Sequence, residues 1–383
     1  MMIQNYMWAG LLLLAMTVVK EGRAVNVDGG FEGIQEQDLF VSGKGGYHTY
    51  RIPAIVASTK GMLLAFCEGR KTSRSDTGDI DTVLRRSVDS GKTWLPLQVV
   101  WDDAGNCCGN PSPVVDAETG TIWLLSTWNR GDDHEGEIKN RTSKDTRRVF
   151  ACSSEDDGAT WSKPVEITAT TKKPNWTWYA TGPCHGIQIK QGSHKGRLVV
   201  PCDHIEAKTK RYYSHAIYSD DHGKTWKLGG STPMHQVNEC TVAELSDGRL
   251  MLNMRNYDRS KKARQIAFSN DGGTTWQDQT ADHALIELAC QGSLLRVTSP
   301  EDHTKPWLLF SNPASTSGRV QMTVRASYDD GKTWPAAQLI HAGGSAYSDL
   351  VKLGENEVGC LYEADGYKRI ALARVSLERL SAP

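Results

Sequence analysis

Short apolar runs, each preceded by a tight polar turn, recur along the whole chain. They read KGMLLAFCEGR, TGTIWLLSTWNR, KGRLVVPCD, DGRLMLNMRN, TKPWLLFSNP and GENEVGCLYEAD. A turn followed by a run of this length is typical of a β-strand. The pattern therefore predicts six repeated units, each containing one such strand.

A second motif, S-x-D-x-G-x-T-W, occurs five times, and its copies begin at Ser87, Ser154, Ser219, Ser269 and Ser327. It is typical of a hairpin turn, because the Asp bonds to the backbone of its own loop and the Gly supplies a positive φ. The Trp is expected to cover the junction. Five copies on five separate units cannot converge on one substrate, so we interpret these Asp residues as structural.

The two repeats together predict the fold. Copies of the second motif begin 50 to 67 residues apart, which suits units of four short antiparallel strands. Six such units account for the chain and indicate an all-β fold, a six-bladed β-propeller. The turn motif is absent from the last unit, so we expect strands from both chain ends to complete it.

Strand order also predicts which loops share a face. In an antiparallel four-stranded unit, the starts of first strands, the ends of second strands and the connections between second and third strands lie on one face. The turn motifs lie on the other. Eight polar residues map to the first of these faces: Arg51, Glu239 and Tyr347 open first strands, Arg70, Arg255 and Glu363 end second strands, and Asp76 and Arg319 lie in connections. This sorting indicates a functional face.

At these residues the chain resembles the sialidase (exo-α-neuraminidase) family, in its bacterial type. The resemblance rests on the segment YRIP, the five turn motifs, known in that family as Asp-boxes, three separated arginines and the late segment AYSDL, in that order. It covers essentially everything after the first 24 residues.

The resemblance implies an anion clamp for the carboxylate of sialic acid. Its arginines would be Arg51, Arg255 and Arg319, since guanidinium groups hold a carboxylate through paired, charge-assisted hydrogen bonds. Arg325 is a rival for the third place, although it lies on a strand that leads toward the opposite face. Glu363 would orient Arg51.

The resemblance also implies the catalytic residues. Sialidases are an established exception to the two-carboxylate scheme of glycosidases and use a tyrosine nucleophile, here Tyr347. A neutral phenol avoids the repulsion that a carboxylate would meet beside the anionic sugar. Glu239 would act as its base, and Asp76 would protonate the leaving oxygen and later activate water. Asp79 and Asp81 follow Asp76 closely and stay as alternatives.

Three further residues match pocket positions of relatives. Arg70, Asn110 and Trp128 would line the part that receives the ring substituents and the acyl group, although Trp128 could equally pack between strands. Tyr179 and His185 fall near the same face, and a proton-shuttle role for His185 has only this location in its favour.

Composition narrows the remaining possibilities. The 383 residues carry a formal net charge of −1, which argues against a nucleic acid partner. Several of the nine cysteines lie in apolar runs, so we expect most to be buried thiols, and no cysteine spacing indicates a metal. We therefore predict no cofactor and no metal.

The N-terminus resembles an export signal. An apolar run from Met7 to Val19 precedes Gly22-Arg23-Ala24, a small-x-small cleavage pattern, although no Lys or Arg precedes the run and an uncleaved anchor stays as the alternative. We predict a signal peptide over residues 1–24, a catalytic domain over 25–383, no membrane span in the mature chain and a secreted or periplasmic location.

The predicted function is that of an exo-α-sialidase acting with retention on sialylated glycoproteins, glycolipids or oligosaccharides. A trans-sialidase, in which a sugar hydroxyl intercepts the same intermediate, is one alternative. A propeller that binds sialic acid without catalysis is the other, although it would not need Tyr347, Glu239 and Asp76 together.

Overall fold

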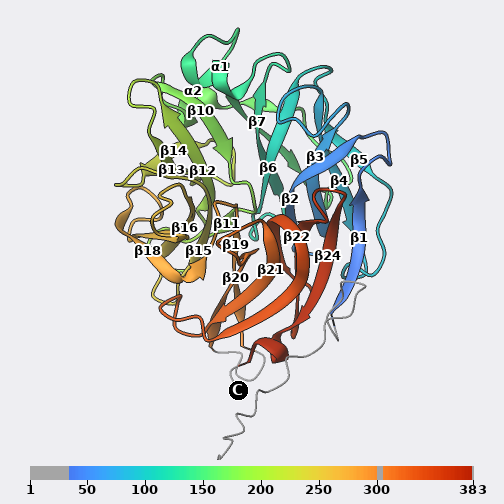
Figure 1. The fold of residues 1–383 in the computed structure, drawn as a ribbon, viewed down its shortest axis with the longest axis vertical. Coiled ribbons are helices and arrows are strands. Elements are labelled where there is room, and N and C mark those ends of the chain that lie inside the picture. The colour runs from blue at the N-terminus through green and yellow to red at the C-terminus, as the bar shows by residue number, and fades with distance from the viewer. Residues whose placement is uncertain (1–33, 300–304, 382–383) are drawn as a thin grey trace, which may run out of the picture.

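The computed structural model describes residues 34–299 and 305–381 (Figure 1). The predicted signal peptide, residues 1–24, lies outside the described residues, so its cleavage and the location of the protein stay predictions. Strands dominate, and the described helices are short: α1 (Glu135–Asn140), α2 (Thr168–Thr171) and the 3-10 helix η1 (Leu377–Leu380). The fold is all-β, as the sequence predicts. Among these residues, no helix has the length and apolar character needed to cross a bilayer.

The strands of the described chain pair antiparallel in six successive units around the molecule, of which the third has five strands and the others have four (Figure 1). The first three units contain β2 (Thr49–Ala57), β3 (Leu63–Arg70), β4 (Ile80–Ser87) and β5 (Gln98–Trp101); β6 (Cys107–Val115), β7 (Ile122–Asn129), β8 (Arg148–Ser154) and β9 (Val165–Glu166); and β10 (Trp176–Thr181) with β11 (Ile187–Gln188), β12 (Leu198–Glu206), β13 (Tyr212–Ser219) and β14 (Lys227–Ser231).

The last three units contain β15 (Val237–Glu244), β16 (Leu250–Asn256), β17 (Ala263–Ser269) and β18 (Gln277–Ile286); β19 (Ser293–Thr298), β20 (Pro306–Pro313), β21 (Val320–Ser327) and the first part of β22 (Ala336–Lys352); and the second part of β22, β23 (Glu357–Ala364), β24 (Arg369–Ser376) and β1 (Gln35–Val41). Because β1 pairs antiparallel with β24, strands from both chain ends complete the last unit, which confirms that expectation.

The six apolar runs form the second strand of each unit. These strands are β3, β7, β12, β16, β20 and β23, and every residue of β3 is buried. A central strand packed between neighbouring sheets is covered on both faces, so its sequence is apolar along its whole length. All nine cysteines are buried free thiols, as expected.

Apolar clusters fill the spaces between consecutive units. Phe66 of the first unit packs with Leu124 of the second, and equivalent clusters follow in chain order. A further cluster joins Leu63 of the first unit to Leu372 of the last. The core is therefore a series of interfaces between sheets.

The Asp-box turns join third to fourth strands, as predicted, and the second copy shows their geometry. Asp156 accepts from Thr160 N (2.8 Å) and Thr160 Oγ1 (2.6 Å), and from Ser154 Oγ (2.8 Å). Gly158 has φ 78° and donates its N–H to Ser154 Oγ. Trp161 packs against Phe66 of the preceding unit, with ring centroids 5.7 Å apart. The Asp156 carboxylate therefore binds its own turn, which is a structural role.

Candidate active site

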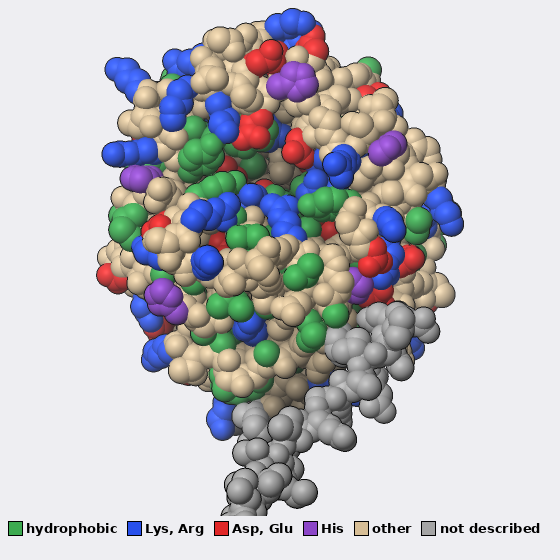
Figure 2. Space-filling view, in the orientation of Figure 1, with side chains coloured by type: hydrophobic (Ala, Val, Ile, Leu, Met, Phe, Trp, Pro, Cys, Tyr) green, Lys and Arg blue, Asp and Glu red, His purple; other side chains and the backbone are tan. Residues whose placement is uncertain are grey.

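A cavity of about 340 Å³ lies where first strands begin and second strands end. Figure 2 shows a hollow near the middle of the molecular surface, with basic and acidic side chains gathered around it. The residues predicted from sequence that line the cavity are Arg51, Arg70, Asp76, Asn110, Glu239, Arg255, Arg319 and Tyr347. Strand order therefore brings together side chains from five of the six units.

Tyr347 lies on β22 where this long strand passes from the fifth unit to the sixth, beside a register shift between Ser345 and Ser348. Its hydroxyl donates to Glu239 Oε1 at 2.5 Å. Arg255 Nη1 donates both to the Tyr347 oxygen (3.0 Å) and to Glu239 Oε2 (2.5 Å). The phenol therefore already has a proton acceptor and a cation beside it.

The environment keeps this phenol neutral. Burial and then the negative charge of Glu239 raise the pKa of Tyr347 well above its ordinary value, although Arg255 and Arg319 oppose the rise. A neutral phenol is a weak nucleophile until a base removes its proton as it attacks. The hydrogen bond to Glu239 supplies such a base.

Two further arginines surround the same ring. The guanidinium carbons of Arg51 and Arg319 lie 5.4 and 5.6 Å from the ring centre of Tyr347. Tyr367 links the two arginines, because Arg51 lies over its ring at 4.1 Å and Arg319 Nη1 donates to its hydroxyl at 3.2 Å. With Arg255, three of the five arginines that line the cavity surround one phenol.

Glu363 holds Arg51 and the backbone of Tyr347 in place. This fully buried carboxylate accepts from Arg51 Nε (2.6 Å) and Ile52 N (2.8 Å) with one oxygen, and from Tyr347 N (3.1 Å) with the other. It does not line the cavity. The contact to Arg51 is the one that the sequence predicts.

Asp76 lies at the exposed edge of the cavity, in the connection after β3. Its Oδ1 lies 2.8 Å from Arg70 Nη2 and 3.9 Å from Arg51 Nη1, and its side chain is 69% exposed. Burial alone would raise the pKa of Asp76, but Arg70 and Arg51 outweigh it and hold the pKa below its ordinary value.

The two alternatives to Asp76 have other partners. Lys71 Nζ lies 3.0 Å from Asp79, 3.2 Å from Asp81 and 3.4 Å from Asp102. The Lys71 ammonium group therefore lies between these three carboxylates. Asp79 and Asp81 do not line the cavity, so the geometry favours Asp76.

Asn110 and Arg70 are fixed by a shared carboxylate. Asn110 has φ 50°, and its N–H donates to Glu68 Oε1 at 2.9 Å. The other oxygen of Glu68 accepts from Arg70 Nη2 at 2.6 Å. The buried Glu68 carboxylate therefore holds both residues in position at the cavity wall.

Trp128 is not brought to the cavity. It lies on β7, where successive side chains point to opposite faces, and its Nε1 donates to Asp103 Oδ2 at 2.7 Å. Its neighbour Asn129 instead bonds to Arg147, which lines the cavity. The alternation of the strand therefore places Trp128 with Asp103 and Arg148, in a separate surface pocket.

Three other residues named from the sequence also lie elsewhere. Tyr179 is fully buried in an apolar cluster, and His185 lines a different cavity. Arg325, the rival for the third arginine, lies 3.4 Å from Asn312 Oδ1 and does not line this cavity.

The cavity also contains residues that sequence reasoning missed. Arg147 stacks on Trp178 at 3.9 Å, and Tyr257 and Tyr367 also line the wall. Asp203 is buried, and neither of its carboxyl oxygens has a hydrogen-bond partner within the described residues. Burial and then Glu239 raise the pKa of Asp203 well above its ordinary value.

Comparisons with known proteins match this geometry to one family. The sequence profile of the BNR repeat-like domain matches residues 61–360. A sialidase of Micromonospora viridifaciens is 37% identical over 339 residues, covering 86% of this chain and 52% of the relative. A sialidase of Bacteroides fragilis is 32% identical over 398 residues, covering 94% of this chain and 71% of the relative. This chain belongs to the sialidase family.

The structural similarity agrees with this assignment. The solved structure of the Hadza microbial sialidase Hz136 is 32% identical to this chain, with a TM-score of 0.82, and covers 90% of this chain and 69% of that one. The chain spans about half the length of the Micromonospora relative. Membership of the sialidase family makes the chain a glycoside hydrolase by class.

Proposed function

We propose that this sialidase-family chain is an exo-α-sialidase, which hydrolyses terminal α-ketosidically linked sialic acids of glycoproteins, glycolipids or oligosaccharides with retention of configuration. The observation that carries the proposal is the hydrogen bond from Tyr347 to Glu239 inside a cavity where the guanidinium groups of Arg51, Arg255 and Arg319 surround the phenol. A cavity of about 340 Å³ suits one small ligand and therefore a terminal sugar.

We also propose that the six units form a six-bladed β-propeller. Apolar clusters between consecutive units, and the cluster that joins the first unit to the last, support this arrangement. In a propeller the first strands surround the axis, and the cavity lies at one end of it.

Arg51, Arg255 and Arg319 would bind the sugar carboxylate. Guanidinium groups suit this task because their N–H groups match the two oxygens of a carboxylate, and they stay charged in a buried site. Glu363 and Tyr367 would hold two of these arginines in position before substrate arrives, through the contacts described above.

In the first step, the Tyr347 oxygen forms a bond to the anomeric carbon as the glycosidic C–O bond breaks. Glu239 takes the phenolic proton, and Asp76 gives its proton to the leaving oxygen. Asp76 must be protonated for this. Binding of the substrate carboxylate would neutralise Arg51 and cover Asp76, and both effects raise the pKa of that carboxyl.

In the second step, Asp76 removes a proton from water, and the water oxygen bonds to the anomeric carbon. The bond to the Tyr347 oxygen breaks, and Glu239 returns the proton to the phenol. Two displacements on the same carbon restore the original configuration, so the product is released with retention.

The test is release of a fluorogenic aglycone from an α-sialoside by the purified chain, with Tyr347→Phe as the variant. The substitution removes one oxygen and little volume, so an unchanged unfolding midpoint is the control. We expect turnover by the wild type and at least about a thousandfold loss of kcat in the variant. Full activity of Tyr347→Phe would contradict the proposal.

The same reaction separates hydrolysis from transfer. Following the reaction of a sialylated oligosaccharide by NMR should show free α-sialic acid as the first product. A new sialoside or an internal anhydro sugar would instead identify a trans-sialidase, and saturable binding of sialic acid without turnover would identify a binding protein.

A further inference from the structure

A second, larger cavity of about 620 Å³ lies at the opposite ends of the first strands. The strands that carry Arg51, Glu239 and Tyr347 into the catalytic cavity end in the second cavity with Ala57, Glu244 and Lys352. The two cavities therefore share these strands but open on different faces, and none of the described residues lines both. The proposed sialidase chemistry uses no residue of the second one.

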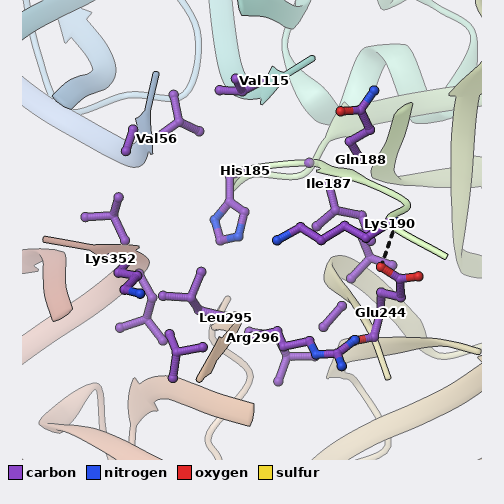
Figure 3. Close-up of a pocket in the computed structure, with 18 of the residues that line it drawn as sticks. Val56, Val115, His185, Ile187, Gln188, Lys190, Glu244, Leu295, Arg296 and Lys352 are labelled. Carbon is purple, nitrogen blue, oxygen red and sulfur yellow. Dashed lines mark hydrogen bonds between the residues drawn. The ribbon is translucent and has the colours of Figure 1, made fainter. Parts of the chain in front are cut away.

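Aliphatic side chains form most of the wall of this second cavity. Figure 3 shows Val56, Val115, Ile187 and Leu295 around it. Its size lies within the range of roughly 300–1,000 Å³ that is usual for small-molecule sites. An apolar wall of this extent favours a ligand with an apolar body.

A buried histidine is directed into the cavity. His185 is 7% exposed, and Figure 3 shows its ring projecting among the lining residues. Its Nδ1 lies 2.7 Å from Asp349 Oδ1, and that carboxylate also accepts from Ile55 N and Ser293 Oγ. The Asp349 contact leaves Nε2 without a hydrogen-bond partner among the described residues. Burial would lower the pKa of His185, but Asp349 raises it above its ordinary value.

The remaining charges of the lining are mostly positive. Lys190 and Lys352 are exposed and form no ion pair within the described part of the chain. Arg296 donates to the carbonyl oxygens of Glu244 and Leu245. The carboxylate of Glu244 accepts from Lys190 N (2.9 Å) and Gln191 N (3.1 Å), so two backbone groups already bind it.

We propose that this cavity is a binding site for an amphipathic carboxylate, with the anionic head between His185 and Lys190 and an unbranched apolar tail along the aliphatic wall. Figure 3 shows the Lys190 side chain extending toward the middle of the cavity, where the His185 ring lies. Lys190 donates hydrogen bonds to an anion, and His185 Nε2 donates one when the ring is protonated, because Nδ1 is already bonded to Asp349. Lys352 adds a second positive charge, and the aliphatic side chains remove the tail from water.

The test is calorimetric titration of the full chain with hexanoate, octanoate and decanoate below their micelle concentrations. We expect one saturable site whose affinity rises about threefold to fourfold with each added methylene. Decylamine, which has the same tail and a positive head, should not bind. Absence of saturable decanoate binding, or equal binding of decylamine, would overturn the proposal.

A charge variant and a competition experiment locate the site. Lys190→Glu should weaken decanoate binding about tenfold or more. Lys195→Glu is the matched control, because Lys195 is exposed in the turn before β12 and does not line the cavity. Both positions are exposed, so unchanged unfolding midpoints are expected.

The competition arm separates this site from the catalytic cavity. A saturating amount of free sialic acid should leave decanoate binding unchanged. Displacement by sialic acid would place the fatty carboxylate on the catalytic arginines, and equal affinity of the Lys190→Glu and Lys195→Glu variants would place it outside this cavity. Either result would overturn the inference, whether or not the chain is a sialidase.

Discussion

Carboxylates lie at both ends of the strands, and the two groups differ in what binds them. In the Asp-box turns, Asp156 accepts all its hydrogen bonds from residues within four positions of itself. At the other end, Glu239 contacts Tyr347 and Arg255, and Asp76 contacts Arg70 and Arg51. The first group binds its own loop, while the second binds side chains of other strands and, in the case of Glu239, of another unit.

The turn carboxylates are therefore expected to contribute to stability, and the cavity carboxylates to catalysis. The hydrogen bonds from Thr160 lower the pKa of Asp156 to about 2, so the turn carboxylate is ionised and its acceptor positions are used. Glu239 instead accepts the proton of a buried phenol that is itself a candidate nucleophile. The comparison predicts that substitutions in the cavity change turnover and that substitutions in the turns change stability.

The largest expected effect is on the base. Glu239→Gln keeps the size of the side chain but removes its ability to take the Tyr347 proton, so kcat should fall by about a hundredfold to ten-thousandfold. Asp156→Ala in the second Asp-box is the comparison variant and should keep the wild-type kcat. Steady-state kinetics on an α-sialoside measure both, and equal losses in the two variants would break the comparison.

Asp76→Asn should produce the next largest loss. A variant without the general acid should lose about a hundredfold in kcat on a natural sialoside, and less on an aryl sialoside whose leaving group needs no proton. Asp79→Asn is the matched control because Asp79 contacts Lys71 outside the cavity. A greater loss in Asp79→Asn than in Asp76→Asn would show that Asp76 is not the general acid.

Arg319→Lys should have a smaller effect that falls mainly on KM. The lysine keeps the positive charge but loses the paired N–H groups that match a carboxylate, so KM should rise about tenfold. The hydrogen bond to Tyr367 would be lost as well. An unchanged KM would remove Arg319 from the proposed clamp.

The smallest expected effect is on stability. Asp156→Ala removes the acceptor for three hydrogen bonds of an exposed turn, and we expect the free energy of unfolding to fall by about 1–2 kcal/mol. Denaturant unfolding of the wild type and the variant measures this difference. Glu239→Gln, in contrast, should unfold with the wild-type midpoint or close to it.

The stability difference should also depend on pH. The folded pKa of Asp156, about 2, lies below its ordinary value, so the folded state binds fewer protons and ionised Asp156 stabilises it. Its contribution should be complete above about pH 4 and be lost as the pH falls toward 2. Unfolding of both proteins across this range should show the two curves converging in acid; a constant difference would contradict the assignment.

The fold was predictable because its determinants are local. The six apolar runs form second strands, and the five turns lie between third and fourth strands, since each is specified within a few residues. The face that carries Arg51, Glu239 and Tyr347 then follows from strand order. The predicted contact between Glu363 and Arg51 is present because the last unit lies beside the first.

Other parts of the cavity were not predictable in the same way. The resemblance predicts Trp128 in the pocket, but strand alternation directs its side chain to Asp103. Tyr367 and Trp178 reach the wall from a loop and from β10, and no repeat marks them. Asp203, like Arg255, follows an apolar run, so its place in the sequence also marks it as a candidate site residue.

The most direct test of the account is chemical trapping of the intermediate. In 2,3-difluorosialic acid, attack by the Tyr347 oxygen expels fluoride from the anomeric carbon, and the second fluorine slows hydrolysis of the product by destabilising the cationic transition state. Peptide mass spectrometry after incubation should show the sugar adduct on Tyr347, and no adduct in Tyr347→Phe. An adduct on Glu239, or unimpaired turnover of sialosides with no adduct on any residue, would contradict the account.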